Sequence, residues 1–477
     1  MSTPSASTQI TDLPITLHLG PPLGGQGATE ALTDQVHAAL QATLSQLLAT
    51  LGIPARPALM LEFIADELPD GRLFELDITD RLCPCPDELL LTTYSYILGR
   101  PQVEPGALAA LRGWLAESDA PTVAEWLSLT VRYALACRPS VLLSEPQAAA
   151  YCAALLGSPT SQQLSPVLRK VLDMGISLAD RAAVGAALAE SGHSWAAAEQ
   201  LIAALRPDVL EIRVEPSYLR QVTIEHGPRL FDELLPFMRD GLFVELGMSY
   251  PTFRFVADDT LHPRAFAFTI NHLVGLPMVG LASDKILVND TSDRLRLMNV
   301  DGEAAGNPAT YQPAALVDAR HKEQLEAAGL TTWDDLGYFI LAFAAELRRN
   351  GARLMDLRLA EQMLSQLSQV YPALERATRE HIAPARLAGI LRELAADQLS
   401  IRNLRCILDR LLEYELFVGE GDLGDFVRAG MRNFIGHKLS RGTSTAEARV
   451  CETICPSVRT CSPGCWRSRR QPAASPA

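Results

Sequence analysis

Long uncharged apolar runs are missing from this chain of 477 residues. A helix needs about 18 apolar residues to cross a bilayer, and the best candidate, residues 336–345, is far shorter. The first eleven residues hold no Lys or Arg ahead of a hydrophobic segment, so the charged start of a secretory signal is missing too. These absences favour a cytoplasmic protein with no direct membrane insertion.

Positive charge and aromatic residues are also scarce. The chain has 42 Lys and Arg against 56 Asp and Glu, a net charge of −14, and only 6% aromatic residues. An acidic chain without a basic stripe repels phosphate backbones, which argues against a nucleic-acid partner. Hydrophobic residues still make up 48% of the chain, enough for folded cores in about two to four domains.

The segment 441–477 differs in composition from the rest of the chain. Six Arg and two acidic residues give it a charge of +4, which leaves −18 on residues 1–440. It also holds four of the nine cysteines, Cys451, Cys455, Cys461 and Cys465. Four thiolates could surround zinc, but zinc ribbons use C-x2-C pairs. We therefore expect no metal site, and a disordered tail or an aberrant end of the sequence.

An internal repeat runs through the body of the chain. Residues 167–188 align without gaps with residues 390–411, with identities at Leu168/Leu391, Arg169/Arg392 and Ser177/Ser400. Apolar residues keep their register in both segments. Each copy predicts two helices separated by a short Ile-Ser-Leu or Leu-Ser-Ile step.

Three further matches precede this one in the same order. Helices are predicted to end at glycine C-caps in Leu47-x3-Leu51-Gly52 and Leu242-x3-Leu246-Gly247. Half-buried strands are predicted at residues 73–78 and 265–270, where residue types alternate with a period of two. Capped helix starts are predicted at Thr122-x-x-Glu125 and Thr332-x-x-Asp335.

Chance similarity between Ala/Leu-rich helices explains any one of these matches, whereas four in collinear order favour a duplication. The predicted fold class is α+β and helix-rich, with two tandem copies of a mixed α/β subdomain followed by a helical subdomain. The predicted domains are a disordered N-terminal tail (1–12), a degenerate first copy (13–207), a second copy (208–440) and the tail 441–477. A Gly/Pro-rich seam is expected at residues 302–313.

The second copy resembles the cytosolic domain of the FHIPEP family, the export-gate proteins of flagellar and type III secretion. The matching residues are Ile382-Ala-Pro384-Ala-Arg386-Leu387, followed by Leu399-Ser-Ile401-Arg402-Asn403-Leu404-x2-Ile407-Leu408. They resemble the family's Pro-led helix and the helix after it. Shorter matches are Glu245-Leu246-Gly247-x3-Pro251, Ala328-Gly329-Leu330-Thr331-x2-Asp334 and Phe426-Val427-Arg428.

The resemblance implies a non-enzymatic docking platform whose subunits form a ring and bind chaperone–substrate complexes in a cleft. Family members also carry a membrane-embedded N-terminal half, where this sequence has the degenerate first copy. The family's Thr-His pair is replaced by Leu341-Ala342, and its last α/β subdomain is missing beyond about residue 440. The sequence thus predicts a scaffold or adaptor without cofactors. Its expected partners are export-apparatus components, secretion chaperones or further copies of itself.

Trp333, Asp334 and Tyr338 form the candidate partner-binding site, because aromatic residues beside polar groups are typical of binding surfaces. Tyr338 at helical spacing fits a core equally well. The Asp334-Asp335 pair also suits a helix N-terminus, where carboxylates complement the helix dipole. No catalytic, cofactor-binding or metal-binding residue is predicted.

An enzyme that binds a nucleotide or dinucleotide is the alternative function. Residues 419–424, from Gly419 to Gly424, read G-x-G-x-x-G and follow the apolar run 416–418, as in a dinucleotide fingerprint. Glu420, Asp422 and Asp425 would repel a pyrophosphate, which favours a loop between two helices.

Two further patterns are weak indications of a catalytic serine and of a metal site. Ser249 lies in half of a nucleophile elbow, after a predicted helix rather than a strand, so catalysis is not expected there. His226, His262 and His272 lack the spacing of metal ligands on a helix, and we expect surface or loop histidines.

Overall fold

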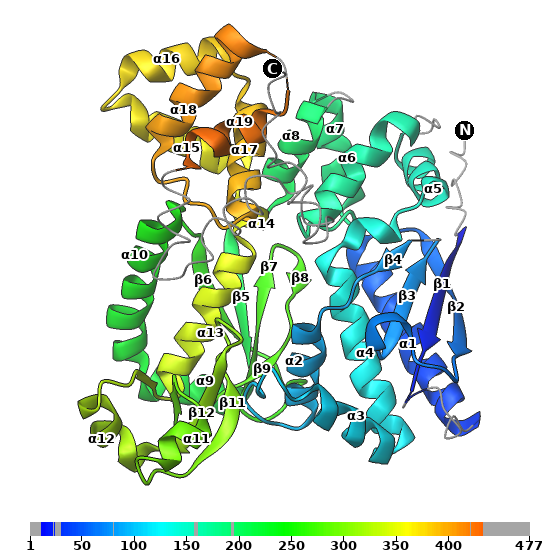
Figure 1. Ribbon diagram of the computed structural model, residues 1–477. Helices are drawn as coiled ribbons and strands as arrows, with labels where there is room; N and C mark the ends of the chain where they lie inside the picture. Colours follow the sequence, from blue (N-terminus) through cyan, green and yellow to red (C-terminus); the bar gives the residue numbers. More distant parts are fainter. Residues whose placement is uncertain are drawn as a thin grey trace, which may run out of the picture. The chain divides into compact units, whose positions relative to one another are not determined.

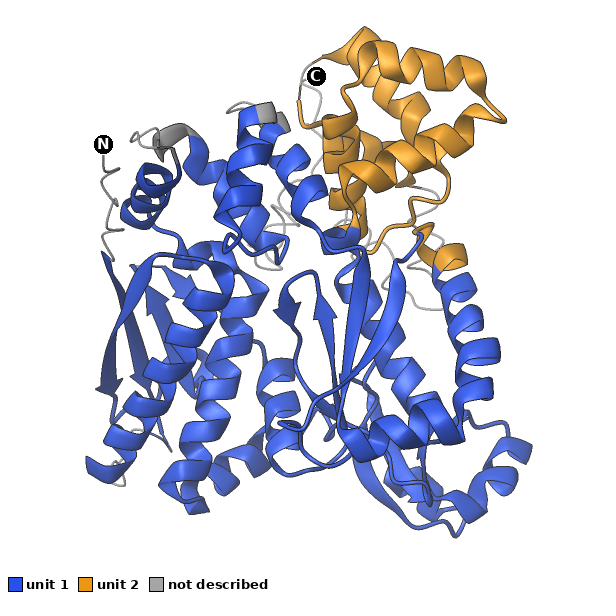
Figure 2. Cartoon of the chain, turned by 180° about the vertical axis from the view of Figure 1, so that it is seen from behind, with its two compact units in different colours: residues 1–242, 249–354 blue, residues 243–248, 355–477 orange. Residues whose placement is uncertain are grey.

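The structure is a computed structural model that describes residues 11–21, 23, 30–79, 81–156, 161–191, 195–419 and 421–432. The predicted tail 441–477 with its four cysteines lies outside these ranges, as do residues 1–10. The chain divides into two compact units (Figure 2). Unit 1 comprises residues 1–242 and 249–354, and unit 2 comprises residues 243–248 and 355–477.

The first sheet of unit 1 lies near the start of the chain (Figure 1). Its elements are β1 (Thr11–Leu19), α1 (Glu30–Leu51), β2 (Ala55–Phe63), β3 (Phe74–Ile78) and β4 (Leu82–Cys83), with a short turn η1 (Pro69–Gly71) before β3. The strand order is β2-β1-β3-β4, with β1 parallel to β2 and antiparallel to β3. Every second residue of β1, from Leu13 to Leu19, is buried in one core with apolar side chains of the helices.

A run of helices follows this sheet. It contains α2 (Asp87–Ile97), α3 (Leu108–Glu117), α4 (Ala120–Cys137), η2 (Pro139–Leu142), α5 (Glu145–Leu156), α6 (Ser161–Asp173), α7 (Arg181–Ser191) and α8 (Trp195–Leu205). The N-cap of α4 is Asp119, whose carboxylate accepts a hydrogen bond from the Thr122 amide at 3.1 Å. The predicted capping role of Thr122 is therefore wrong, because the helix starts before it.

The second sheet of unit 1 repeats the strand order of the first. Its elements are β5 (Val209–Val214), α9 (Pro216–Arg220), η3 (Gln221–Glu225), η4 (Arg229–Leu234), α10 (Leu235–Leu246), β6 (Thr252–Ala257), β7 (Ala265–Ile270), β8 (Leu273–Val274) and β9 (Met278–Val279). The order is β6-β5-β7-β8, with β5 parallel to β6, β5 antiparallel to β7, and β9 also paired with β7.

All six residues of β7 are buried, so the predicted half-buried strand is a strand with both faces covered. On one face Phe266 and Phe268 pack against Phe339, with ring centroids 4.9 and 6.0 Å apart. On the other face Ala265 shares a small core with Tyr96 of α2. Both faces of β7 are therefore covered by other parts of unit 1, which suits its almost wholly apolar sequence.

A third sheet completes unit 1. It contains β10 (Lys285–Val288), β11 (Gly302–Gly306), β12 (Pro313–Asp318) and β13 (Thr332–Trp333) in the order β11-β12-β10-β13, with α11 (Ser292–Arg296), η5 (Ala319–His321) and α12 (Lys322–Ala327). The helices α13 (Asp335–Arg349) and α14 (Gly351–Leu354) follow. Residues 302–313, predicted as a seam, thus include the strand β11 and the first residue of β12.

Unit 2 is helical over its described residues. Its helices are α15 (Leu357–Ser368), α16 (Pro372–His381), α17 (Pro384–Ala396), α18 (Leu404–Glu413), η6 (Tyr414–Val418) and α19 (Leu423–Gly430). The predicted Pro-led helix is confirmed, since α17 begins at Pro384. The molecule is of mixed α+β class, as predicted. None of the helices within the described ranges is long and apolar enough to span a bilayer.

Two glycines end helices in the left-handed conformation, as the sequence predicts. Gly52 follows α1 with φ of 71°, and Gly247 follows α10 with φ of 76°. A Cβ atom on Gly52 would lie 2.3 Å from the Ala179 nitrogen, and one on Gly247 would lie 2.2 Å from the Arg402 nitrogen. Only glycine fits at either position, because both the backbone angle and the neighbouring chain exclude a side chain.

The residue before each of these glycines accepts an equivalent hydrogen bond through its carbonyl oxygen. In unit 1 the Leu178 amide donates to the Leu51 carbonyl at 2.8 Å, and in unit 2 the Ile401 amide donates to the Leu246 carbonyl at 2.8 Å. Leu178 and Ile401 occupy equivalent positions in the short step between the predicted helix pairs. The pairs α6/α7 and α17/α18 confirm the two helices predicted on either side of that step.

Candidate functional site

The predicted partner-binding residues lie where β13 meets α13. Asp334 is the N-cap of α13, and its Oδ1 atom accepts a hydrogen bond from the Gly337 amide at 2.8 Å. Its Oδ2 atom accepts a hydrogen bond from Arg229 at 2.8 Å and lies 3.8 Å from the ammonium of Lys322. The predicted role of this acidic residue at a helix N-terminus is confirmed. The predicted cap at Thr332 is wrong, because that residue lies in β13.

The charge of Asp334 is fixed by these neighbours. Burial alone would raise the pKa of its carboxyl group, but the hydrogen bonds from Arg229 and Gly337, with the positive charges of Arg229 and Lys322, hold the pKa below its usual value. Asp334 is therefore ionised over the physiological pH range.

Trp333 and Tyr338 have different environments. Trp333 is half-buried in β13 opposite Leu287. Tyr338 is fully buried, and its hydroxyl accepts a hydrogen bond from the Gln102 amide at 3.2 Å. The structure thus places Trp333 and Asp334 at the start of α13 and Tyr338 in the core beneath them. Their role in partner binding stays a prediction.

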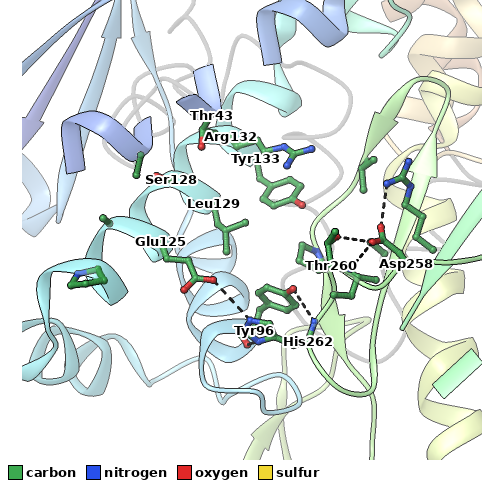
Figure 3. A pocket seen from close by; sticks show the side chains of 18 of the residues that line it. Thr43, Tyr96, Glu125, Ser128, Leu129, Arg132, Tyr133, Asp258, Thr260 and His262 are labelled. Carbon is green, nitrogen blue, oxygen red and sulfur yellow. Dashed lines mark hydrogen bonds and ion pairs between the residues drawn. The ribbon is translucent and has the colours of Figure 1, made fainter. Parts of the chain in front are cut away.

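A second candidate site, which the sequence does not predict, is a cleft of about 740 Å³ within unit 1 (Figure 3). One wall consists of side chains from α1, α2 and α4, including Ser128 and Arg132. The opposite wall comes from β5, β7 and the loop 258–262, with Arg213 from β5. The cleft therefore lies between the helices α1, α2 and α4 and the second sheet.

One of the two carboxylates in the cleft is ion-paired, and the other lies beside a histidine. Asp258 accepts hydrogen bonds from Arg213 at 3.2 Å and from the amide and hydroxyl of Thr260 at 3.1 and 2.6 Å. Burial would raise the pKa of Asp258, but these donors hold it below its usual value. The carboxylate of Glu125 lies 3.9 Å from Nε2 of His262.

His262 is held against the helical wall. Its ring stacks on Tyr96 with centroids 4.3 Å apart, and its Nδ1 atom lies 3.1 Å from the Tyr96 carbonyl oxygen. The sequence predicts a surface or loop histidine at this position, and the half-buried ring follows β6 in the loop that borders the cleft. His262 and Tyr96 thus join the two walls at one end of the cleft (Figure 3).

Other polar groups in the cleft lack partners among the described residues. The hydroxyl of Ser128 and the Nε atom of Arg213 are buried without a hydrogen bond. Arg132 makes a cation–π contact with Tyr133 at 5.6 Å, and no carboxylate of the described chain pairs with it. Arg132 and Ser128 share one face of α4, but Arg213 comes from a distant strand. No spacing in the sequence could have shown that these residues line one cleft.

The glycine-rich segment 419–424 does not have the setting of a dinucleotide site. It follows η6 rather than a strand, and Asp422 caps α19 by accepting a hydrogen bond from the Asp425 amide at 2.7 Å. The segment connects two helices, as the charge argument predicts, although Glu420 lies outside the described residues. The alternative function is not supported.

The remaining candidate residues do not form a reactive cluster. His226 lies 3.8 Å from Asp335, and Nδ1 of His272 accepts a hydrogen bond from the Ser177 amide at 3.2 Å. Burial lowers the pKa of His272. Ser249 is exposed after the end of α10. Over the described ranges, no three His, Cys, Asp or Glu residues converge on a point that could hold a metal.

Several known proteins are similar to this chain. The secretion protein HrcV of Ralstonia nicotianae is 29% identical over 209 residues, which cover 43% of this chain and 29% of HrcV. The flagellar biosynthesis protein FlhA of Bacillus subtilis is 20% identical over 256 residues, which cover 53% of this chain and 37% of FlhA. The chain thus spans about a third of the length of these relatives.

Among solved structures, the CdsV protein of Chlamydia pneumoniae aligns with a TM-score of 0.43 and 25% identity, covering 50% of this chain and 68% of that one. The sequence model of the FHIPEP family matches residues 141–454. That match covers well over half of the chain and includes the segments on which the resemblance was based. The chain therefore belongs to the FHIPEP family, whose members serve type III secretion and flagellar export.

Proposed function

We propose that the protein is a non-enzymatic scaffold or adaptor that binds other proteins of a type III secretion or flagellar export apparatus in the cytoplasm. The family match over residues 141–454 carries this proposal. Its partners are export-apparatus components, secretion chaperones with their substrates, and further copies of the chain. The start of α13, with Trp333 and Asp334 above the buried Tyr338, forms part of the binding surface.

The body of the chain is the product of an internal duplication in this proposal. The shared strand order of the first two sheets supports it. So do the matching hydrogen bonds from Leu178 to Leu51 and from Ile401 to Leu246. The third sheet has no counterpart among the described residues of the first half. The first copy would thus be reduced, and it would supply part of unit 1 instead of a separate docking module.

Partner recovery from the protein's own cells tests the function. The tagged full-length chain is cross-linked gently, and the recovered proteins are identified by mass spectrometry. We expect export-gate components or secretion chaperones. Recovery of the chain alone, or of unrelated proteins only, would contradict the proposed function.

A pair of variants tests the binding surface in the same experiment. Trp333→Ala removes the half-buried indole at the start of α13, whereas Leu297→Ala removes a side chain that is 86% exposed in the same part of unit 1. We expect weaker recovery of partners with Trp333→Ala and unchanged recovery with Leu297→Ala. Equal recovery of partners with both variants would show that the binding surface lies elsewhere. It would not contradict the scaffold function.

A further inference from the structure

We propose that two copies of the chain pair through the free edge of β2, which joins their first sheets into one continuous sheet. This inference rests on the proposed function only in that further copies of the chain are among its partners. The surface belongs to unit 1 and lies outside residues 141–454, which the family model matches.

The strand β2 is an open edge of the first sheet (Figure 1). It pairs with β1, and no other strand of the described chain pairs with it. The Ile64 amide donates to the Leu19 carbonyl at 2.8 Å, so the even-numbered residues of β2 direct their N–H and C=O groups to β1 in this parallel ladder. The odd-numbered residues, including Leu59 and Leu61, direct theirs away from the sheet. Pro57 fits this arrangement, because its missing N–H is one that would point outward.

The corresponding edge of the second sheet is protected against pairing, whereas the edge at β2 is not. The strand β6 has six residues, and the exposed Arg254 lies near its middle, where a charged side chain opposes the addition of another strand. The strand β2 has nine residues, and residues 58–61 at its middle carry no charge. Met60 in this segment is 54% exposed. A long apolar edge of this kind is a template for one more strand.

The sequence of β2 is complementary to itself in the antiparallel direction. Arg56 and Glu62 are both exposed on the outer face of the sheet, at equal distances on either side of Leu59. An antiparallel pair centred on Leu59 places Arg56 opposite Glu62 of the second copy, and two-fold symmetry repeats this contact. Met60 then lies opposite Ala58 of the second copy, so a large side chain meets a small one. The second copy of this chain is therefore the partner strand that this edge fits.

Both charged side chains can be reached by the second copy. The side chain of Glu62 is 48% exposed, and its Oε2 atom lies 3.0 Å from Nδ1 of His18 on β1. A carboxylate accepts several hydrogen bonds, so Glu62 can also accept from a guanidinium group. Arg56 lies beside Asp12 of β1, and no ion pair joins these two residues. In the proposed pair Arg56 would lie near two carboxylates.

The backbone groups of the edge support the same register. Leu59 faces Leu59 of the second copy, and their outward amides and carbonyls exchange hydrogen bonds in both directions. Each Leu61 amide faces the Pro57 carbonyl of the second copy. That carbonyl already accepts a hydrogen bond from Nε2 of Gln41 at 2.9 Å, but a carbonyl oxygen has two lone pairs. Main-chain hydrogen bonds would thus provide affinity, and the two symmetric ion pairs would fix the register.

Sedimentation velocity of the purified full-length chain over a range of concentrations tests the pairing. We expect a dimer, and we expect Met60→Lys, which places a charge near the centre of the pair, to raise its dissociation constant about tenfold or more. The control is Leu82→Lys on β4, at the opposite edge of the same sheet, where Leu82 is 58% exposed. This control should leave the dissociation constant unchanged. Thermal unfolding shows that both variants are folded.

Charge reversal tests the register. Arg56→Glu and Glu62→Arg each place like charges opposite one another at both symmetric contacts, so each variant alone should dimerise about tenfold or more weakly. An equimolar mixture of the two variants should recover association as a mixed dimer, because every facing pair is then oppositely charged.

Three results would overturn the proposal: a parent chain that stays monomeric at its highest soluble concentration, equal association of the parent and Met60→Lys, or a mixture of the two charge variants that does not associate. Partner recovery from cells separates these failures from failure of the proposed function. A chain that captures export components without pairing through β2 would retain the scaffold function and contradict the proposed interface.

Discussion

Arg353 should stabilise the contact of α14 with the C-terminal ends of α4 and α6. This residue of α14 donates hydrogen bonds to the carbonyls of Ala136 at 2.8 Å, Cys137 at 3.0 Å and Asp173 at 3.1 Å. Two of these carbonyls end α4, where the helix dipole favours a cation. Burial lowers the pKa of Arg353, since the guanidinium has given up much of its hydration for these three acceptors.

The expected loss of stability follows from the number of hydrogen bonds that are lost and from how exposed each of them is. A hydrogen bond from a charged donor contributes about 1.5–3 kcal/mol. The carbonyls of Asp173 and Cys137 lie near the surface, where water replaces much of a lost donor. We therefore expect Arg353→Met, which keeps most of the apolar stem, to destabilise the contact by about 2–4 kcal/mol rather than by the full sum.

Hydrogen exchange is the appropriate assay, because a chain with two compact units does not unfold in one step. Amides in the last turn of α4 should exchange at least about thirtyfold faster in Arg353→Met, which corresponds to about 2 kcal/mol. The control is Arg296→Met, in a pair with Asp293 where the arginine side chain is 62% exposed. It should change exchange little, since exposed pairs contribute about 0–1 kcal/mol.

The same exchange in Arg353→Met as in Arg296→Met would refute the reasoning. Faster exchange in helices that do not contact Arg353, with α4 unaffected, would also refute it. In either case the three hydrogen bonds would not stabilise the contact of α14 with the ends of α4 and α6.

Three further predictions follow from single contacts. Asp334→Ala should cost about 1–2 kcal/mol of stability and Asp334→Asn less, because asparagine still caps α13. The pKa of Asp334 is lowered by folding, so the parent chain should be more stable than Asp334→Asn, with the full difference present above about pH 4. This difference in the free energy of unfolding should disappear as the pH falls through the folded pKa, which urea unfolding at a series of pH values measures. Gly52→Ala and Gly247→Ala should each cost more than about 1 kcal/mol, because the added Cβ meets backbone atoms at 2.3 and 2.2 Å; a neutral change in thermal unfolding would contradict this. Tyr338→Phe should cost about 1–3 kcal/mol by leaving the Gln102 amide without its acceptor, and unchanged stability would show that another acceptor replaces it.

Local chemistry is the part of the fold that the sequence could predict. Gly52 and Gly247 end their helices because only glycine adopts the left-handed angle against a neighbouring chain. Pro384 begins α17 because its fixed φ angle suits the first turn of a helix. Each of these features depends on a few neighbouring residues, so the sequence predicts it without any knowledge of tertiary contacts.

Tertiary contacts account for the features that the sequence could not predict. The strands β10 and β13 are four and two residues long, too short for a periodic pattern to identify. Residues Gly302–Gly306 form β11 although small residues disfavour strands, because β12 pairs with them along their whole length. The burial of both faces of β7 likewise depends on helices distant in the chain.

The cleft is the clearest case of a site that arises only on folding. Taken alone, Ser128 is a small residue in a helix core, Arg132 a surface charge and Arg213 one residue of an alternating strand. Their chemistry appears when the second sheet faces α4 and leaves the Ser128 hydroxyl and the Arg213 Nε atom buried without partners. Unsatisfied polar groups of this kind are rare in folded proteins. Both atoms have almost no exposed surface, so they are unpaired groups packed inside the two walls and result from the tertiary contacts, which no local pattern in the sequence could have predicted.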